Sequence, residues 1–485
     1  MGKKSKRKLA TKALAVAVAV SMLPGSAMTA FANTGTGTEP GALAIGHPTF
    51  KNTESLADVY DLGGVTYDSK EMMKALYQQD LDNGGDSFYM DRILARYGVA
   101  NGNAGNNGND DGNTFMTRGR ALYMNTSNPG IIGFGGKTSY GCSSSGSSLG
   151  GDMYAINFSD DTGALSTKEV TSKRVNYPSN WVSQYQVGSL TADVEKFISN
   201  ENVAVTTVKL TNTEGADKTI VVNVNSNFVS SRDEVTVGGE TQQELTGSMN
   251  STADLTKITT RLSGNGFEYA EGSNKSMVKT VTIPAGQTVE VKVVMAFTTE
   301  ELPQSTADYV RFLELDGTSA LKAQKAEYNE YWAENLPYID VPNKAVQKAI
   351  DYRWWLERFN TMDANIPGYD FQYPVTVEGV LGYNNAIALT QPMHLQDTKW
   401  LRNAYLPLGQ LLSVGNSSQS SAFLDNPGNR SNWNNHYGQY IADAGLEAFN
   451  VIGGGAELAE NLAYYFEHDA KGQPVSYTHL TLPTN

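Results

Sequence analysis

The spacing of apolar residues changes once along the chain, near residue 301, and this change constrains the fold more than any other feature. From about 115 to 300, apolar and polar residues alternate with a period of two, as they do in half-buried strands. After about 301 the period becomes 3.6, which is typical of amphipathic helices. The sequence therefore predicts a multidomain chain, with an antiparallel β-sandwich over 61–300 followed by an α-helical part.

Two Val- and Thr-rich stretches carry the clearest strand signal. In "TTVKLTNTEGADKTIVVNVNS" two alternating runs flank a Glu-Gly-Ala-Asp turn, and in "KSMVKTVTIPAGQTVEVKVVMAF" two more flank Pro-Ala-Gly-Gln. Turn residues between alternating runs are typical of β-hairpins. We expect two hairpins here, in a sandwich that serves as a scaffold.

The helical pattern begins with "STADYVRFLEL" and "SALKAQKAEYNEYWAENL", which predict two linker helices within 301–338. Ser305 has the residue type of an N-cap, with Asp308 at the third helical position. Pro342 precedes another apolar helix and is suited to a helix start. Further helices are expected over 384–396, 399–414, 435–452 and 456–468.

The first 32 residues have the parts of a secretory signal peptide. Basic "KKSKRK" precedes the apolar run "ALAVAVAVSML", and Ala30-Phe31-Ala32 has the small-x-small form of a cleavage site. An uncleaved membrane anchor is the alternative, but the run is short for a span. We expect cleavage near Ala32, a loose Gly/Thr-rich leader over 33–60, and a secreted protein without membrane contact after cleavage, either free or attached to the cell surface through further modules.

Composition limits the possible partners. The formal net charge is −14, and removing the six Lys and Arg residues of the signal peptide makes it −20. A strongly acidic chain without a basic patch is not expected to bind nucleic acid. Cys142 is the only cysteine, so no intramolecular disulfide and no Cys/His metal cluster can form. The sequence indicates no oligomeric state.

Two polar stretches are expected to lie outside the fold proper. Residues 100–113, "ANGNAGNNGNDDGN", have oxygen side chains of the kind calcium takes, but their spacing does not match an EF-hand loop, so we expect a plain surface loop and no cofactor. Residues 474–485, "PVSYTHLTLPTN", resemble translated sequencing-adapter sequence and are expected to be a non-native tail. A natural disordered terminus is the alternative for this tail.

The order of elements resembles that of the six-hairpin glycosidases, in which an N-terminal β-sandwich precedes an (α/α)6 toroid. The resemblance rests on the linker helix and first toroid helix in "EYWAENLPYIDVPNKAVQKAIDYRWWLERF", and on "GYNNAIALTQPMHLQDTKWLRN" as the following helices. Within that superfamily the sequence looks most similar to glycoside hydrolase family 121, the β-L-arabinobiosidases. The resemblance covers roughly 115–473 and implies that 339–473 is the N-terminal part of a catalytic toroid. It also implies an incomplete toroid, because about six helices follow residue 340 where twelve are needed.

The first loop of the implied toroid contains the leading catalytic candidate. Within "YPVTVEGVLGYNN", Glu378 is the only charged side chain, and its apolar neighbours could raise its pKa as an acid/base role requires. The aromatic rings of Tyr373 and Tyr383 could stack on a sugar, and the amides of Asn384 and Asn385 could bind its hydroxyl groups. The alternative is a structural glutamate that caps a helix or pairs with an arginine.

A second loop, "DNPGNRSNWNNHYGQYIADAG", combines aromatic and amide groups at a predicted helix start. This mixture suits the rim of a sugar site, although a capped loop with no binding role would use the same residues. The candidate substrate-binding residues in this loop are Trp433, Asn434, Asn435, His436 and Gln439.

Other polar and aromatic residues have plainer interpretations. Trp354 and Trp355 lie in mid-helix and are expected in the core. His394 is expected to be a hydrogen-bonded structural histidine, and Asp397 to cap a helix starting near Thr398. Three acids that flank the first toroid helix are expected to be solvated: Glu357, Asp363 and Asp370.

The sequence thus predicts a glycoside hydrolase acting on plant-type oligo- or polysaccharides, arabinose-containing glycans among them, by a two-carboxylate reaction. The partner of Glu378 is expected later in the toroid, beyond this chain, so the chain by itself is expected to hydrolyse no glycoside. The alternatives are a carbohydrate-binding surface protein without catalysis and a glycoside phosphorylase.

Overall fold

The computed structural model describes part of the 485-residue chain. The described residues are 59–62, 65–68, 71–75, 78, 117–125, 131–141, 148–251, 256–339, 341–366, 373–377, 390–402, 406–407, 409–411, 418–419, 422–424, 433–434 and 441–452. The predicted signal peptide, the Asn/Gly-rich loop, the predicted helix over 456–468 and the adapter-like tail lie outside them.

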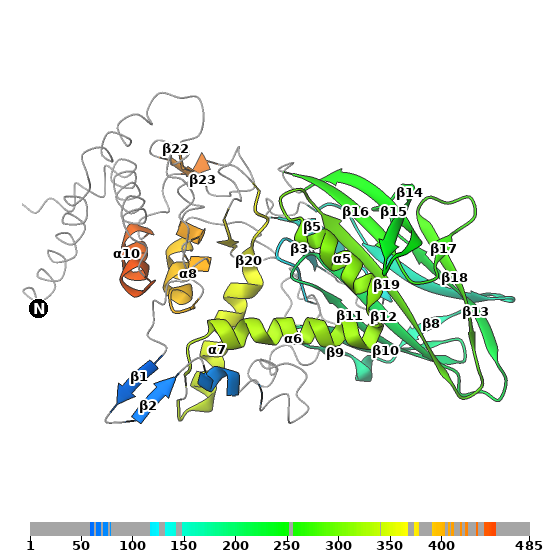
Figure 1. The fold of residues 1–485 in the computed structure, drawn as a ribbon, viewed down its shortest axis with the longest axis horizontal. Helices are drawn as coiled ribbons and strands as arrows, with labels where there is room; N and C mark the ends of the chain where they lie inside the picture. Colours follow the sequence, from blue (N-terminus) through cyan, green and yellow to red (C-terminus); the bar gives the residue numbers. More distant parts are fainter. Residues whose placement is uncertain are drawn as a thin grey trace, which may run out of the picture.

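Two large antiparallel sheets form the first half of the described chain (Figure 1). The nine-stranded sheet has the order β14 (Ser231–Val237), β15 (Glu240–Asn250), β16 (Lys257–Ser263), β19 (Thr288–Thr298), β12 (Val203–Thr211), β11 (Leu190–Ile198), β10 (Trp181–Val187) and β8 (Thr167–Glu169), with β9 (Val175–Asn176) beside β10. The six-stranded sheet has the order β17 (Glu268–Tyr269), β18 (Ser276–Ile283), β13 (Lys218–Asn225), β6 (Tyr154–Asp160) and β4 (Gly133–Phe134), with β7 (Gly163–Ala164) beside β6.

The two sheets pack face to face around one apolar core, as the alternation of the sequence predicts. Tyr154 and Val222 come from the smaller sheet, Tyr185 and Val208 from the larger, and all four belong to one cluster of fully buried side chains. The Tyr154 hydroxyl crosses the core to within 2.8 Å of the Thr206 hydroxyl, which satisfies both buried polar groups. The predicted β-sandwich is therefore present.

The two expected hairpins are a wrong prediction, although their strands exist. β12 pairs with β11 and β19 in the larger sheet, whereas β13 pairs with β6 and β18 in the smaller one. β18 and β19 are divided between the sheets in the same way. Each turn therefore crosses from one sheet to the other, which lets both of its strands turn an apolar face to the same core.

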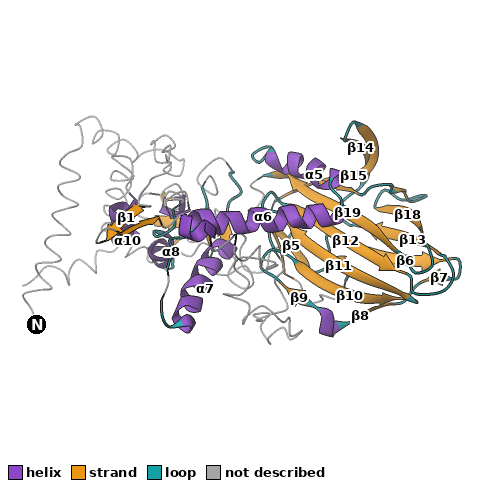
Figure 2. Ribbon diagram, turned by 60° about the horizontal axis from the view of Figure 1, so that its bottom comes forward, coloured by secondary structure: helices purple, strands orange, loops and turns teal. Residues whose placement is uncertain are grey.

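Two helices, α5 (Gln304–Glu314) and α6 (Gly317–Asn335), lie along the outer face of the nine-stranded sheet (Figure 2). Phe312 of α5 and Leu321 of α6 form a second buried cluster with Val205 of β12 and Val294 of β19. Because β12 and β19 are covered by the core on one side and by these helices on the other, they are the most deeply buried strands of the larger sheet.

A side chain caps the start of two of the four α-helices whose N-cap residue is described. Asp316 and Asn343 each accept a hydrogen bond from a main-chain N–H in the first turn of α6 and of α7 (Lys344–Asn360). The prediction that Ser305 caps α5 is wrong. Its N–H already donates to Leu302 O at 3.1 Å, so Ser305 lies buried inside the first turn, and Pro303 occupies the cap position without a side-chain bond.

The helical part continues beyond the sandwich with α7, α8 (Gln391–Thr398) and α10 (Ile441–Ile452), and residues 406–407 and 409–411 are also helical. Helix α8 contacts both α7 and α10. The described chain is thus a β-sandwich followed by helices, and closure of those helices into an (α/α)6 toroid stays a prediction. The remaining short strands are β1 (Val59–Leu62), β2 (Val65–Asp68), β3 (Leu122–Asn125), β5 (Lys137–Tyr140), β20 (Thr361–Met362), β21 (Val375–Thr376), β22 (Ser418–Gln419), β23 (Ala422–Leu424) and β24 (Trp433–Asn434).

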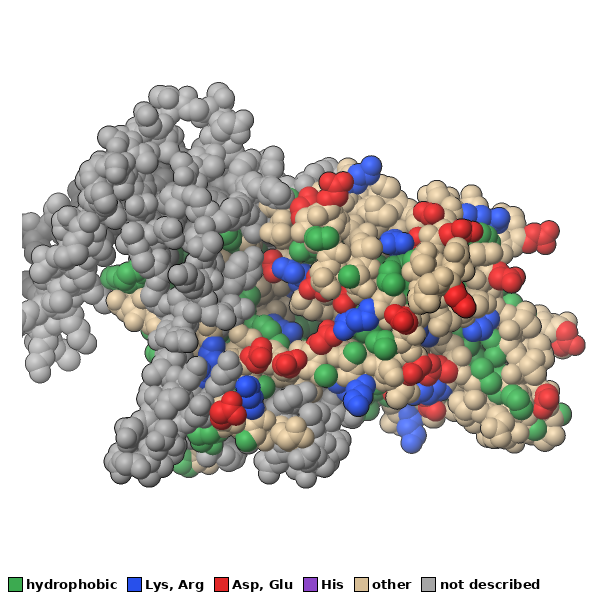
Figure 3. Space-filling model, in the orientation of Figure 1, with side chains coloured by type: hydrophobic (Ala, Val, Ile, Leu, Met, Phe, Trp, Pro, Cys, Tyr) green, Lys and Arg blue, Asp and Glu red, His purple; other side chains and the backbone are tan. Residues whose placement is uncertain are grey.

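Acidic and basic side chains are interspersed over the sandwich and its covering helices on the face shown in Figure 3. Mixed charges of this kind give no extended field of one sign on that face of the described chain. The expectation that the protein binds no nucleic acid stays a prediction. No helix among the described residues is long and apolar enough to cross a membrane.

Gly247 on β15 provides a test of the sandwich packing. A Cβ atom there would lie 2.1 Å from Phe228 O and 2.7 Å from the Thr260 hydroxyl, so backbone would have to move. We expect Gly247→Ala to lower the free energy of unfolding by roughly 2–4 kcal/mol, measured by urea denaturation. Gly215→Ala is the control, because nothing lies within 4 Å of that Cβ, and its midpoint should match the wild type. Equal midpoints for both variants would contradict the packing of β15.

Candidate functional site

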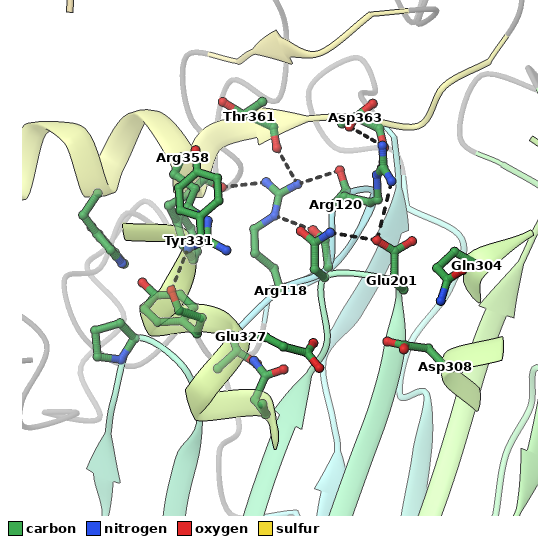
Figure 4. Close-up of a pocket in the computed structure, with 18 of the residues that line it drawn as sticks. Arg118, Arg120, Glu201, Gln304, Asp308, Glu327, Tyr331, Arg358, Thr361 and Asp363 are labelled. Carbon is green, nitrogen blue, oxygen red and sulfur yellow. Dashed lines mark hydrogen bonds and ion pairs between the residues drawn. The ribbon is translucent and has the colours of Figure 1, made fainter. Parts of the chain in front are cut away.

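A pocket of about 590 Å³ lies where the end of the β-sandwich meets α5, α6 and α7. Arg118 and Arg120, which precede β3, form one wall, and Glu201 lies in the turn between β11 and β12. Figure 4 shows these side chains together with Tyr331 of α6 and Asp363, which follows β20. The pocket is therefore built from segments of both structural halves.

Arg118 joins the sandwich to the end of the first helix beyond the linker. Its guanidinium donates hydrogen bonds to Phe359 O at 2.7 Å and to Thr361 O at 2.9 Å. The same group lies 6.0 Å from the centre of the Phe359 ring. A planar guanidinium can serve two carbonyls at once, which fixes the direction of the chain as it leaves α7.

Arg120 makes a second connection at the same junction. It pairs with Asp363 and lies 3.5 Å from a Glu201 carboxylate oxygen, while its own main-chain carbonyl accepts a 2.7 Å hydrogen bond from Asp363 N. Burial raises the pKa of Asp363, and the Arg120 charge opposes that shift. Asp363 was expected to be solvated, and that prediction is wrong because its partner lies far away in the sequence.

A second group of charges also lines the pocket. Arg311 of α5 pairs with Glu327 of α6 and lies 2.9 Å from Asp308, one turn back on its own helix. Asp308 also accepts a 3.1 Å hydrogen bond from the Ser199 hydroxyl. Burial raises the pKa of Asp308 to about 6, with Arg311 opposing the shift, so this carboxyl holds its proton into the mildly acidic range.

Aromatic rings form the floor between α6 and α7. The Arg358 guanidinium lies 3.7 Å above the centre of the Tyr331 ring and 4.6 Å from that of Tyr328. Trp355 and Phe359 stack with centroids 4.9 Å apart. Trp355 is buried in the core, as predicted, and also contributes to the pocket lining.

The base of the loop that carries Glu378 adjoins this pocket. Thr361, which lines the pocket, pairs with Thr376 across β20 and β21, and their hydroxyl groups lie 3.1 Å apart. Val377 is fully buried, and its N–H donates to Asn360 O at 3.0 Å. Glu378 is the next residue in the sequence and lies outside the described residues, so the structure fixes only the point from which it departs.

Buried amides reinforce that point from the helical side. Thr376 N donates to the Gln410 side chain at 2.7 Å, and Thr376 O accepts from the Gln391 side chain at 3.3 Å. The two amide side chains also bond to each other, and both are 1% exposed. This network leaves little freedom for β21, because its main-chain groups are matched by buried partners.

Two further predictions about acids near α7 and α8 are corrected by the structure. Glu357 is buried rather than solvated, with both carboxylate oxygens 2.9–3.0 Å from His394 Nδ1. Burial raises the pKa of Glu357, and the hydrogen bond to His394 opposes the shift. Asp397 lies inside α8 and pairs with Arg353, so it is not the cap of a following helix. The expectation of a hydrogen-bonded structural histidine at His394 is confirmed.

The sequence-predicted site residues fall mostly outside the described part of the chain. Tyr373 is described and is 5% exposed, so it is buried beside β21. Trp433 and Asn434 form β24, which pairs with β23. Their roles stay predictions, as do those of the candidates that lie outside the described residues: Glu378, Tyr383, Asn384, Asn385, Asn435, His436 and Gln439.

No local pattern in the sequence distinguishes the charged residues of this pocket. Arg118 and Arg120 lie in "TRGRALYMN", a pattern typical of the edge of a strand. Arg311 and Glu327 lie in the linker helices, where charged residues usually face solvent. Among the described residues, no group of three or more His, Cys, Asp and Glu side chains could hold a metal ion. The expectation of no cofactor stays a prediction.

The chain matches no model of a known protein family. Among solved structures it is similar to a human-microbiome protein provisionally assigned as a kojibiose phosphorylase, at 9% identity over 69% of this chain and 57% of that one, with a TM-score of 0.45. It is also similar to a family GH92 α-mannosidase from Bacteroides thetaiotaomicron, at 11% identity over 79% of this chain and 57% of that one, with a TM-score of 0.37.

A family GH92 inverting mannosidase from the same species aligns at 11% identity over 75% of this chain and 54% of that one, with a TM-score of 0.38. The chain thus spans a little over half the length of these solved proteins. At such identities and TM-scores, the similarity by itself says nothing about activity.

The raised pKa of Asp308 predicts a pH dependence of stability. The folded state holds this proton more tightly than the unfolded state, so the stabilising contribution is full below about pH 4 and is lost as the pH rises through about 6. Asp308→Asn is uncharged throughout, so the melting temperature of the wild type relative to this variant should fall between about pH 4 and 6. Parallel melting curves for the two proteins from pH 4 to 8 would contradict the burial of this carboxyl.

Proposed function

We propose that this protein is a glycoside hydrolase, in which the pocket at the sandwich–helix junction receives carbohydrate and the adjoining loop supplies Glu378. The observation that carries this proposal is the position of Thr361. It lines the pocket and at the same time pairs with Thr376, two residues before Glu378. A pocket wall and the base of the candidate catalytic loop are therefore one structural unit.

The chemistry follows from the demands of glycoside hydrolysis. The reaction uses two carboxyl groups, one to protonate the leaving oxygen and one to act as base or nucleophile. Glu378 would be one of them, since Val375 and Val377, which precede it, are fully buried and an apolar setting favours a raised carboxyl pKa. The second carboxyl would come from the helical part, outside the residues that the structure describes.

The finer parts of the proposal rest on the sequence. The resemblance to six-hairpin glycosidases supports an (α/α)6 toroid, and the suggested likeness to family 121 supports plant-type, arabinose-containing glycans as substrates. The signal-peptide pattern supports secretion. We place the remaining sugar contacts in two loops. The first contributes Tyr383, Asn384 and Asn385, and the second contributes Trp433, Asn434, Asn435, His436 and Gln439.

Two other functions are separated from hydrolysis by simple measurements. A carbohydrate-binding protein without catalysis would bind the same sugars and leave them intact. A glycoside phosphorylase would cleave only when inorganic phosphate is present. The arginines of the pocket give that second possibility some weight, although carboxylates in the same pocket pair with two of them, Arg120 and Arg311.

The catalytic role of Glu378 is tested by Glu378→Gln in a homologue that has a longer helical part and the same "YPVTVEGVLGYNN" stretch. Turnover of arabinose-containing oligosaccharides should fall about 10²–10⁴-fold without a change in melting temperature, because the amide cannot exchange a proton. The same change at Glu271, which is exposed on the β17–β18 turn, is the control and should leave turnover unchanged.

Unchanged turnover in Glu378→Gln would remove that residue from catalysis. Turnover that depends on added phosphate would favour the phosphorylase. The substrate panel should also hold α-mannosides and kojibiose, so that the test does not depend on the suggested sugar.

A further inference from the structure

Four residues that line the pocket each have one buried polar atom without a hydrogen-bond partner among the residues that the structure describes. These atoms are Glu201 Oε2, Asp363 Oδ1, Arg311 Nε and the Tyr331 hydroxyl oxygen. They come from four different segments: the β11–β12 turn, the chain after β20, α5 and α6. That all four residues line one cavity is a property of the junction, not of any single element.

Each of the three charged groups is already held by its other atoms. Glu201 uses Oε1 for Asn200 and Arg120, and Asp363 uses Oδ2 for Arg120. Arg311 uses its two terminal nitrogens for Glu327 and Asp308. The ion pairs thus fix the orientation of these groups. One hydrogen-bonding atom of each group has no partner among the described residues.

Unmatched buried polar atoms are costly, at about 1–3 kcal/mol each, so these four favour a ligand whose hydrogen-bonding groups would match them. The two carboxylate oxygens need donors, the guanidinium Nε–H needs an acceptor, and the tyrosine hydroxyl can serve either way. Burial raises the pKa of Tyr331 to about 12, so its hydroxyl stays protonated and able to donate. Hydroxyl groups both donate and accept hydrogen bonds, so a ligand with several hydroxyl groups could bind all four atoms.

The charges of the pocket limit the ligand further. Four arginines line it, Arg118, Arg120, Arg311 and Arg358, and four carboxyls balance them, Glu201, Asp308, Glu327 and Asp363. With formal charges that cancel, the pocket has no excess of either sign to stabilise an anion or a cation. A neutral ligand fits this balance better than a phosphate, a carboxylate or an amine.

The aromatic floor supplies apolar surface against which a sugar ring could pack. Trp355 and Phe359 stack on each other, and Tyr331 lies beneath Arg358, so rigid apolar surface adjoins the four polar atoms. Sugar rings combine an apolar C–H face with hydroxyl groups at the edge. The cavity, about 590 Å³, is within the usual range for small-molecule sites.

From these observations we infer that the junction pocket is a binding site for a neutral saccharide unit, held by Glu201, Asp363, Arg311 and Tyr331 over the aromatic floor. Three of the four ligands come from the β-sandwich and its linker helices, and the sandwich was expected to be a scaffold alone. The inference deepens the proposed function by naming the class of sugar and its ligands, but binding is measured without turnover, so the two can fail separately.

The test uses calorimetric titration of the whole chain with neutral disaccharides of arabinose, mannose and glucose, and with glucuronic acid and glucosamine as charged probes. Tyr331→Phe removes one oxygen atom, so folding should be retained. It should weaken the preferred neutral disaccharide about 3–10-fold, the effect of one lost neutral hydrogen bond. Tyr269→Phe is the matched control, because its hydroxyl donates to Asp233 O on the exposed side of the sandwich, and affinity should stay at the wild-type value.

Glu201→Gln supplies a second variant, expected to weaken binding about 10–100-fold because a charged acceptor is lost. The inference is overturned if the wild-type chain binds none of the neutral disaccharides, if a charged probe binds tightest, or if Tyr331→Phe binds like the wild type. If binding behaves as expected while Glu378→Gln leaves turnover unchanged in the homologue, the saccharide site stands and the proposed role of Glu378 falls.

Discussion

The two hydrogen bonds from the Arg118 guanidinium to Phe359 O and Thr361 O hold the junction on which the rest of the arrangement depends. They join residues 241 and 243 positions apart in the sequence. Hydrogen bonds from a charged donor contribute about 1.5–3 kcal/mol each, and both go to carbonyls two residues apart at the end of α7. Together with the contacts between Arg120 and Asp363, they orient β20 against the sandwich, and β20 in turn positions β21 and the start of the Glu378 loop.

The pocket is a consequence of how this junction satisfies its charges. Arg120 and Arg311 each pair with two carboxyls, which offsets the cost of removing those groups from water. The ion pairs use only some of the polar atoms of each group. Two carboxylate oxygens and one guanidinium N–H therefore have no partner among the described residues, and their residues line a cavity with an aromatic floor. A scaffold contact and a candidate binding site are therefore the same set of side chains, and a change to one alters the other.

The sequence predicted the order of the two halves because periodicity depends on local burial alone. It failed where the deciding partner is distant. The expected hairpins cross between sheets, since a Gly-containing turn serves either connection. Glu357 and Asp363 were expected in solvent because their partners are distant in the sequence. His394, the partner of Glu357, lies 37 residues later, and Arg120, the partner of Asp363, lies 243 residues earlier. For the same reason the junction pocket was missed altogether, while the predicted site around Glu378 lies outside the described residues and stays a prediction.

The central claim is that Arg118 of the sandwich fixes the base of the loop that carries Glu378. Hydrogen–deuterium exchange in Arg118→Lys tests it directly, because lysine keeps the charge but cannot serve two carbonyls with a planar fork. The amides of Asp363 and Val377, which donate to Arg120 O and Asn360 O, should exchange at least tenfold faster than in the wild type, while those of β12 and β19 keep their protection. Unchanged exchange at Asp363 and Val377 would contradict the account.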